Sequence, residues 1–207
     1  MSERSRTYHH GDLADALVQA ALTTVREVGP TALSLREVTR TAGVSPAAAY
    51  RHFQNRSDLM AAVAHQIQLR MADQMRRRMR APQADPPDQR ALQRLRGVGL
   101  GYISFAMEEP GWFMTAFFGD ETTPVDPEPE TKQLAPPFAL LISALDGLVQ
   151  AGLLAHERRP GAEYSCWSAV HGCAELTIRG PLRHADGGTQ REIAARVVED
   201  AITGILH

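Results

Sequence analysis

The chain has 207 residues, of which 43% are apolar and 22% are charged, ordinary proportions for a globular protein long enough to bury a core. No apolar run approaches the length of a membrane span and no apolar signal sequence opens the chain, so we expect a cytoplasmic protein without a membrane partner. The two cysteines, Cys166 and Cys173, imply no disulfide framework.

The net charge of −2 is unevenly distributed along the chain. Residues 1–80 contain 12 arginines and 7 acidic residues, a net charge of +5, so residues 81–207 carry −7. A basic N-terminal part joined to an acidic remainder suggests a polyanionic partner for the basic part.

The N-terminal region predicts helices in close succession. Apolar residues recur with helical spacing over residues 13–28, and Gly29-Pro30 ends this first helix. Ser34 and Glu37 then form a capping box, in which the serine hydroxyl and the glutamate carboxylate satisfy free backbone amides reciprocally. The box predicts a second, short helix over about 35–41.

A third helix follows over about 46–53. Gly43 breaks the second helix, Ser45 caps the third, and Pro46 occupies its first position, where the missing N–H costs nothing. After a break at Gln54-Asn55, apolar spacing predicts a long helix that continues to about residue 80.

Two short helices joined by a turn that contains glycine form a helix-turn-helix pattern. At ~100° per residue, Ala49 and Phe53 face inward, while Ala47, Ala48 and Arg51 point outward. A recognition helix needs small residues where it enters the major groove, and alanine methyls can contact a thymine methyl. The alternative is a pair of packed helices in an all-α domain, with Phe53 as a core residue under either interpretation.

The remainder of the chain is also helical. Thr189 and Glu192 form a further capping box, which predicts that the last helix begins there. Residues 119–136 form an acidic, proline-rich loop. The other expected helices cover about 89–108, 111–118, 137–151 and 162–179. We therefore expect an all-α fold of about nine helices without strands.

Several conspicuous features are interpreted as structural. The stretch MRRRMR, residues 75–80, starts ~20 residues into the long helix, ~30 Å from its beginning, and predicts a solvated face. His9 and His10 suit an arm beside the first helix better than a metal site. Glycines at 97, 99 and 101 lie within helical spacing and indicate a slim packing face, not a nucleotide loop. Because no catalytic set is recognisable, we expect no enzyme activity, no cofactor and no metal.

The segment 33–63, LSLREVTRTAGVSPAAAYRHFQNRSDLMAAV, resembles the DNA-binding domain of the tetracycline repressor (TetR) family of bacterial transcriptional regulators. The Tyr-x-His-Phe end of the second helix of the motif, followed by a basic residue and Asp-Leu, carries the resemblance. YHHGDL at 8–13 resembles the start of one subgroup, and WSAVHG at 167–172 resembles the Trp…His-Gly signature of that subgroup's C-terminal domain. The resemblance is strong over about residues 7–65 and patchy beyond them.

The resemblance implies a DNA-binding set. Positions that contact phosphates in the family carry Ser34, Tyr50 and His52 here, and Arg56 stands in place of a phosphate-binding lysine. Positions that meet bases carry almost no hydrogen-bonding group except Arg51, which leaves the rest of the readout to methyl contacts and DNA shape. The expected DNA-binding residues are Ser34, Ser45, Pro46, Ala47, Ala48, Tyr50, Arg51, His52 and Arg56.

The resemblance also implies a division of the chain. We expect a helix-turn-helix domain over 1–56 and a helical ligand-binding and dimerisation domain over 57–207, whose first part, 57–80, is a connecting helix. In this family the last two helices usually pair with their copies in a second subunit as a four-helix bundle. An apolar stripe on the last helix is consistent with a homodimer, although an intramolecular core explains it equally well.

Aromatic side chains gather in the second half of the chain, where the family binds ligands. We expect a small hydrophobic or aromatic ligand, with His171 or Tyr102 as its polar anchor and with room provided by the glycines at 97, 99 and 101. Taken singly, each aromatic residue is equally well explained as core. The candidate ligand-binding residues are Tyr102, Phe105, Trp112, Phe113, Phe117, Phe138, Trp167 and His171.

The sequence thus favours a dimeric transcriptional repressor, released from a palindromic double-stranded DNA operator by a small hydrophobic ligand. One alternative is a regulator of the same fold without a small-molecule ligand. The other is an all-α enzyme or carrier whose helix-turn-helix is vestigial.

Overall fold

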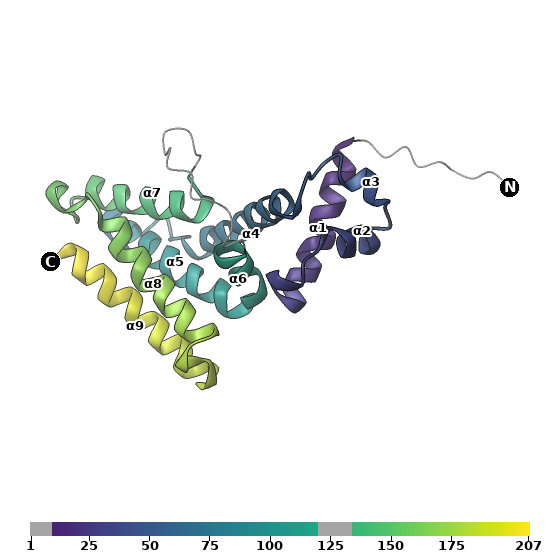
Figure 1. Cartoon of the computed structure of the whole chain (residues 1–207). Helices are drawn as coiled ribbons and strands as arrows, with labels where there is room; N and C mark the ends of the chain where they lie inside the picture. The colour runs from purple at the N-terminus through teal and green to yellow at the C-terminus, as the bar shows by residue number, and fades with distance from the viewer. Residues whose placement is uncertain (1–9, 120–133) are drawn as a thin grey trace. The chain divides into compact units, whose positions relative to one another are not determined.

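The computed structural model describes residues 10–119 and 134–207, and over these ranges the protein consists of nine α-helices, three short 3₁₀ helices and no strand (Figure 1). The α-helices are α1 (His10–Val28), α2 (Leu35–Ala42), α3 (Pro46–Ala49), α4 (Arg56–Arg78), α5 (Pro87–Glu108), α6 (Pro110–Phe118), α7 (Pro136–Gln150), α8 (Ala162–Ile178) and α9 (Gly187–Leu206). The expected all-α fold of about nine helices is confirmed. His9 and most of the acidic loop lie outside the described residues.

Two helix boundaries differ from the sequence prediction. The α-helical part of α3 ends at Ala49 instead of residue 53, and the following residues continue as turns, in which the His52 amide donates to the Ala49 carbonyl at 2.9 Å. At α9 the predicted cap Thr189 is wrong, because the helix begins at Gly187 with Asp186 as its cap. The Asp186 carboxylate accepts the amides of Gly188 and Thr189, which satisfies two free donors one turn earlier than expected.

The described residues divide into two compact units. One contains α1, α2, α3, the part of α4 up to Ile67, and α6 from Gly111 onward. The other contains the rest of α4 from Gln68, then α5, α7, α8 and α9. The assignment of α6 to the N-terminal unit had no counterpart in the sequence patterns.

In the first unit, α6 lies directly against the C-terminal half of α1. The Trp112 indole N–H donates to the Leu22 carbonyl at 2.8 Å, and the Arg26 guanidinium lies 5.0 Å from the centre of the Trp112 ring. Gly111 permits this approach, because a Cβ at that position would come within 2.5 Å of the Arg26 carbonyl oxygen. A fully buried Phe113 continues the contact surface into the core of the unit.

In the second unit, α5 packs against α7, α8 and α9, and α8 and α9 run side by side (Figure 1). The glycines of α5 explain how closely its neighbours approach: a Cβ at Gly97 would lie 2.5 Å from the Arg78 carbonyl oxygen, and one at Gly101 would lie 2.8 Å from the Met75 Cα. At Gly99 a Cβ would meet the Val198 side chain at 2.8 Å. The slim packing face is confirmed, but the idea that these glycines leave room for a ligand is wrong, since α4 and α9 fill the space.

Candidate functional site

The turn between α2 and α3 has the backbone geometry that a helix-turn-helix requires. Gly43 adopts a left-handed conformation, with φ of 68°, and its amide donates to the Arg40 carbonyl. The Val44 amide donates to the Thr39 carbonyl at 3.0 Å, so the two bonds form a Schellman motif at the end of α2. A residue with a side chain would be strained at Gly43, which makes this glycine a determinant of the turn.

Both helices of the motif have serine caps. The Ser34 hydroxyl accepts the Glu37 amide at 3.1 Å, and the Ser45 hydroxyl accepts the Ala48 amide at 3.2 Å. Pro46 follows Ser45 at the first helical position. The local capping signals read from the sequence therefore operate at both helices.

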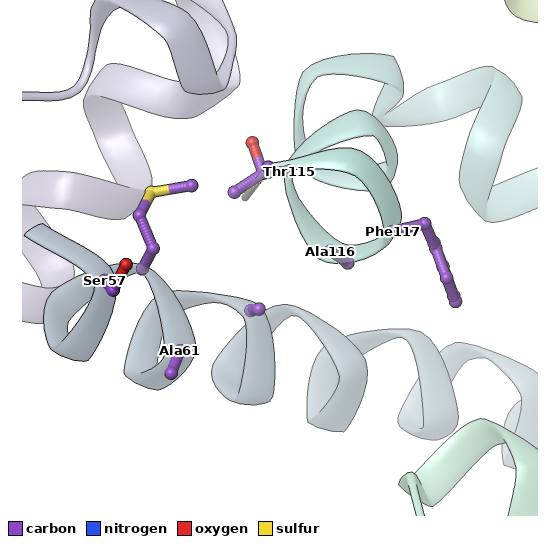
Figure 2. A pocket seen from close by; sticks show the side chains of 8 residues that line it. Ser57, Ala61, Thr115, Ala116 and Phe117 are labelled. Atoms are coloured by element: carbon purple, nitrogen blue, oxygen red, sulfur yellow. The ribbon is translucent and has the colours of Figure 1, made fainter. Parts of the chain in front are cut away.

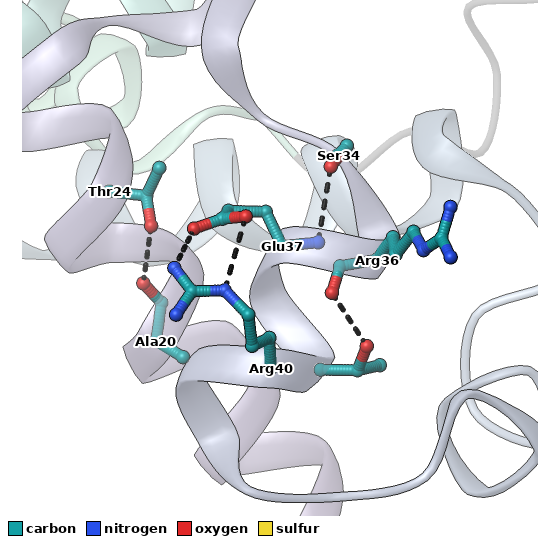
Figure 3. A network of polar contacts seen from close by, with 7 residues as sticks. Ala20, Thr24, Ser34, Arg36, Glu37 and Arg40 are labelled. Carbon is teal, nitrogen blue, oxygen red and sulfur yellow. Dashed lines mark hydrogen bonds and ion pairs between the residues drawn. The ribbon is translucent and has the colours of Figure 1, made fainter.

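The Ser34–Glu37 capping box is only half formed (Figure 3). The Glu37 carboxylate accepts hydrogen bonds from the Arg40 guanidinium one turn later on α2, and no reciprocal bond to the Ser34 amide is seen in the described residues. This hydrogen bond, assisted by the positive charge of Arg40, lowers the pKa of Glu37. Figure 3 shows the Glu37–Arg40 pair. On the same helix the Thr39 hydroxyl donates to the Arg36 carbonyl at 2.8 Å.

The front of α3 is open to solvent. Ser45, Pro46 and Ala47 are exposed, and Ala48 is half-buried. On the opposite side Ala49 is 0% exposed and Phe53 8%, as the helical phase predicted. The exposed front therefore carries only small groups.

Longer polar side chains follow this bare front. Tyr50 is 57% exposed, Arg51 is exposed and His52 is half-buried. Ser34, at the start of α2, is exposed as well. The expected phosphate-contacting and base-contacting residues thus lie on one helix-turn-helix, except Arg56, which begins the next helix.

Arg56, the first residue of α4, binds backbone atoms of its own unit. Its Nε donates to the Leu33 carbonyl at 2.9 Å and its Nη2 donates to the Pro30 carbonyl at 2.7 Å. The side chain is partly buried in this position. No sequence pattern indicated these partners, which lie 23 and 26 residues away along the chain.

Four of the eight candidate ligand-binding residues form a cluster in the second unit. The Tyr102 hydroxyl of α5 lies 2.7 Å from Nδ1 of His171 on α8, and the Trp167 indole N–H donates to the same hydroxyl at 3.3 Å. Phe138 of α7 packs on Trp167, with ring centres 5.1 Å apart. Three helices therefore bring an aromatic surface and a connected polar group together.

The other four candidates have different surroundings. Trp112, Phe113 and Phe117 belong to the first unit, where the rings of Phe113 and Phe117 are tilted to one another with centres 4.9 Å apart and Trp112 is hydrogen-bonded to α1. Phe105, in the second unit, is only 2% exposed. Burial identifies Phe105 and Phe113 as core residues, the structural alternative that the sequence left open.

The polar members of the cluster have shifted pKa values. Burial raises the pKa of Tyr102 above its ordinary range, an effect that the hydrogen bond from Trp167 partly offsets. Burial lowers the pKa of His171, while the negative charge of Glu175 acts in the opposite direction and the positive charge of Arg179 in the same direction. Both side chains are therefore neutral near pH 7, so the cluster offers hydrogen bonds without a net charge.

A small pocket lies within the first unit, between α4 and α6 (Figure 2). Its volume is about 170 Å³. Ligand sites for drug-sized molecules usually measure about 300–1,000 Å³, so this pocket is too small for such a ligand. Its lining residues are Ser57, Met60, Ala61, Ala64, Thr115, Ala116, Phe117 and Gly119.

The remaining features that bear on metal binding, membrane insertion, thiol chemistry and surface charge are the following. Over residues 10–119 and 134–207 no group of three or more His, Cys, Asp and Glu side chains is arranged to hold a metal ion, and no helix is both long and apolar enough to cross a bilayer. Cys166 and Cys173 are buried free thiols, and burial raises the pKa of Cys166 to about 11. The arginines of the MRRRMR stretch are exposed, and Arg76 pairs with Asp73 at 2.6 Å.

Comparison with known proteins identifies both halves of the chain. Residues 17–63 match the family profile "Bacterial regulatory proteins, tetR family", and residues 95–201 match "Tetracyclin repressor-like, C-terminal domain". An uncharacterized HTH-type transcriptional regulator of Mycobacterium tuberculosis is 31% identical over 107 residues, and so is one of Mycobacterium bovis. These alignments cover 51% of this chain and 55% of each relative, so the chain spans about half the length of the curated relatives it matches.

Solved structures share the fold. A protein of unknown function from Rhodococcus sp. RHA1 has a TM-score of 0.73 at 23% identity, covering 98% of this chain and 100% of its own. A TetR variant from Acinetobacter baumannii in complex with minocycline has a TM-score of 0.60 at 17% identity, with 96% of each chain covered. The regulator FadR from Bacillus subtilis in complex with stearoyl-CoA has a TM-score of 0.62 at 13% identity, covering 92% of this chain and 98% of its own.

Proposed function

The chain belongs to the tetracycline repressor family, and from that premise we propose that it is a transcriptional repressor that binds a palindromic DNA operator as a homodimer and leaves it when a small apolar ligand binds. The observation that carries the proposal is the bare, exposed front of α3. Ser45, Pro46 and Ala47 are exposed and carry only a hydroxymethyl group, a compact ring and a methyl group, so the backbone of α3 can approach the floor of a major groove closely.

The residues around that front have complementary roles. Arg51, which is exposed, has the reach and the donors to read a guanine edge, while the methyl groups of Ala47 and Ala48 contact thymine. Ser34, Tyr50 and His52 contact phosphates and set the orientation of the motif on the duplex. The charge of +5 over residues 1–80 favours association with DNA.

The dimer is expected to form through α8 and α9. Leu176 on α8 is 46% exposed and Tyr164 on the same helix is 61% exposed, so α8 presents large apolar groups outside the core of its own unit. Gly172 on α8 and Gly204 on α9 would meet no described atom within 4 Å if they carried a Cβ, so the outer face of this helix pair is slim. A palindromic operator needs two copies of the helix-turn-helix, one for each half-site, and a dimer supplies them.

The ligand is expected to be mostly apolar and to carry a hydrogen-bonding group. Phe138 and Trp167 provide aromatic contact area, and the Tyr102–His171 pair provides the polar anchor. Minocycline and stearoyl-CoA, named with two proteins of the same fold, both combine extended apolar parts with several oxygen atoms. A ligand that favours a conformation in which the two helix-turn-helix motifs of the dimer no longer match the spacing of the half-sites would release the DNA.

Selection of DNA from a random duplex library with the full chain tests the DNA-binding part. We expect a palindromic consensus sequence whose binding weakens steeply with salt. Ala47→Glu places a carboxylate on the exposed front of α3 and should weaken binding to the selected duplex by about 100-fold or more, because an unpaired charge would be held against DNA. Ala139→Glu, at an exposed position of α7, is the matched control and should bind as the parent does. If no duplex is enriched, the proposal fails.

The ligand-binding part has a separate test. Trp167→Ala and His171→Ala should retain folding and operator binding, but a reporter under the selected operator should lose induction across a library of hydrophobic compounds. Two variants that both respond to an inducer as the parent does would locate the ligand site elsewhere.

A further inference from the structure

Arg56 joins the beginning of α4 to the turn that precedes the helix-turn-helix. Its guanidinium donates through Nε to the Leu33 carbonyl and through Nη2 to the Pro30 carbonyl, at 2.9 Å and 2.7 Å. Both distances are those of well-formed, charge-assisted hydrogen bonds. Pro30 is the first residue of the short 3₁₀ helix Pro30–Ala32, which links α1 to α2, and Leu33 follows its last residue.

The two carbonyl groups stand immediately before the DNA-binding motif. The Leu33 side chain is 2% exposed, and Ser34, the cap of α2, follows it directly. The Pro30 carbonyl also accepts the Leu33 amide at 3.3 Å. This hydrogen bond closes one turn of backbone, and Arg56 binds both ends of that turn. The position of the first turn of α2 is thereby tied to the first residue of α4.

Arginine has the geometry for this bridge and lysine lacks it. The Nε–H and one Nη–H lie in one plane along one edge of the guanidinium, so they can reach two fixed carbonyl oxygens at once. An ammonium group at the end of a flexible chain behaves as a point charge and reproduces neither the plane nor the spacing. A lysine would serve equally well only if the task were to neutralise a phosphate.

We propose that Arg56 is a positioning residue that holds α2 in place for DNA binding and is not a phosphate ligand. The inference rests on the proposed DNA binding and goes beyond it, because it replaces the phosphate role that the family resemblance implied for this position. In this arrangement Arg56 acts through the backbone of Pro30 and Leu33, because its guanidinium donates hydrogen bonds to their two carbonyl oxygens.

The experiment compares Arg56→Lys and Arg56→Gln with the parent on the duplex selected from the random library. Affinity is measured over a range of salt concentrations at a temperature where circular dichroism finds all three proteins folded. A positioning role predicts that both variants bind several-fold more weakly at every salt concentration, with slopes of log K against log salt equal to that of the parent. A phosphate contact predicts a slope reduced by about 0.9 in Arg56→Gln and restored in Arg56→Lys.

Thermal unfolding supplies a readout that needs no DNA. Loss of two hydrogen bonds should raise the unfolding equilibrium constant by about tenfold in both variants, whereas Arg36→Gln, at an exposed arginine of α2, should leave it unchanged. Rescue by lysine, a reduced salt slope in Arg56→Gln, or unchanged affinity in the folded variants would each overturn the proposal. If no duplex is enriched, DNA binding itself has failed, and equal stability of Arg56→Lys and the parent would still refute the bridge.

Discussion

The Tyr102 hydroxyl oxygen lies 2.7 Å from Nδ1 of His171, and this contact links α5 to α8. The direction of that bond depends on the tautomer of His171, and we assign it by considering a third residue. The indole N–H of Trp167 can only donate, and it points at the same hydroxyl oxygen at 3.3 Å. Tyr102 accepts this bond and has one hydrogen of its own, which we assign to Nδ1 of His171. His171 is then the neutral tautomer with its proton on Nε2.

This assignment predicts the titration of His171. Burial lowers its pKa in the folded protein, with Glu175 opposing and Arg179 reinforcing the shift, so the unfolded chain binds the proton first as the pH falls. His171 should therefore contribute a loss of stability as the pH drops below about 6.5 toward the lowered folded-state pKa, and no change above it. Nitrogen-15 NMR should find the Nε2–H tautomer at pH 7.

The variant His171→Gln supplies the control for that prediction. Its free energy of unfolding should depend less on pH than that of the parent between the two pKa values, with the remaining histidines common to both proteins. The Nδ1–H tautomer would contradict the assigned hydrogen-bond direction, and a folded-state pKa at or above 6.5 would contradict the dominant effect of burial.

Substitution of the α5 glycines should separate packing from helix propensity. Gly97→Ala places a methyl group 2.5 Å from the Arg78 carbonyl oxygen and should destabilise the protein by about 1–3 kcal/mol, the usual cost of overpacking. Gly147→Ala, on α7, would meet no described atom within 4 Å and should stabilise by about 0.5–1 kcal/mol through helix propensity alone. Chemical denaturation measures both. Equal effects of the two changes would mean that α4 and α5 are not in close contact.

Substitutions at two neighbouring residues of the helix-turn-helix, Tyr50 and Arg51, should affect DNA affinity differently. Arg51→Ala should weaken binding unevenly across single-base variants of the selected duplex, by about 1–3 kcal/mol at the base that Arg51 contacts. Tyr50→Phe should weaken all variants about equally, because a phosphate contact carries no sequence information. Titration of both proteins at fixed salt distinguishes the two roles. A uniform loss for Arg51→Ala would remove it from base recognition.

The exposed Leu176 provides a test of the dimer face. Leu176→Arg should shift the protein toward monomer in analytical ultracentrifugation, since a charge would be placed in an apolar interface. Leu134→Arg, at a similarly exposed leucine outside α8 and α9, is the matched control and should leave the association state unchanged. A dimer that persists in Leu176→Arg would place the interface on another surface.

The helix-turn-helix was predictable from the sequence because its determinants are local. Ser34, Ser45 and Pro46 act on amides within one turn of themselves, and Gly43 owes its role to its own φ angle. The helical phase that buries Ala49 also spans only a few residues. Each of these signals is complete within a short window of sequence.

The contacts that the sequence could not reveal join distant segments. Arg56 donates to carbonyl groups in the turn before α2, and Trp112 donates to a carbonyl group on α1. These contacts could not be predicted because a backbone acceptor has no sequence signature. The start of α9 was predicted wrongly because Asp186 and Thr189 are both good caps three residues apart. The structure selects Asp186, whose carboxylate accepts two amides and the Thr189 hydroxyl.

The glycines of α5 also determine how stiff the second unit is. At Gly97 the nearest atoms are backbone atoms of Arg78 and Met79, and at Gly101 they are the Cα and the first side-chain carbons of Met75. A shift of α5 toward residues 75–78 of α4 would therefore meet these atoms at once. At these two points the distance between the helix axes is limited by atoms at or next to the main chain of α4, and a side chain on α5 would have to widen it.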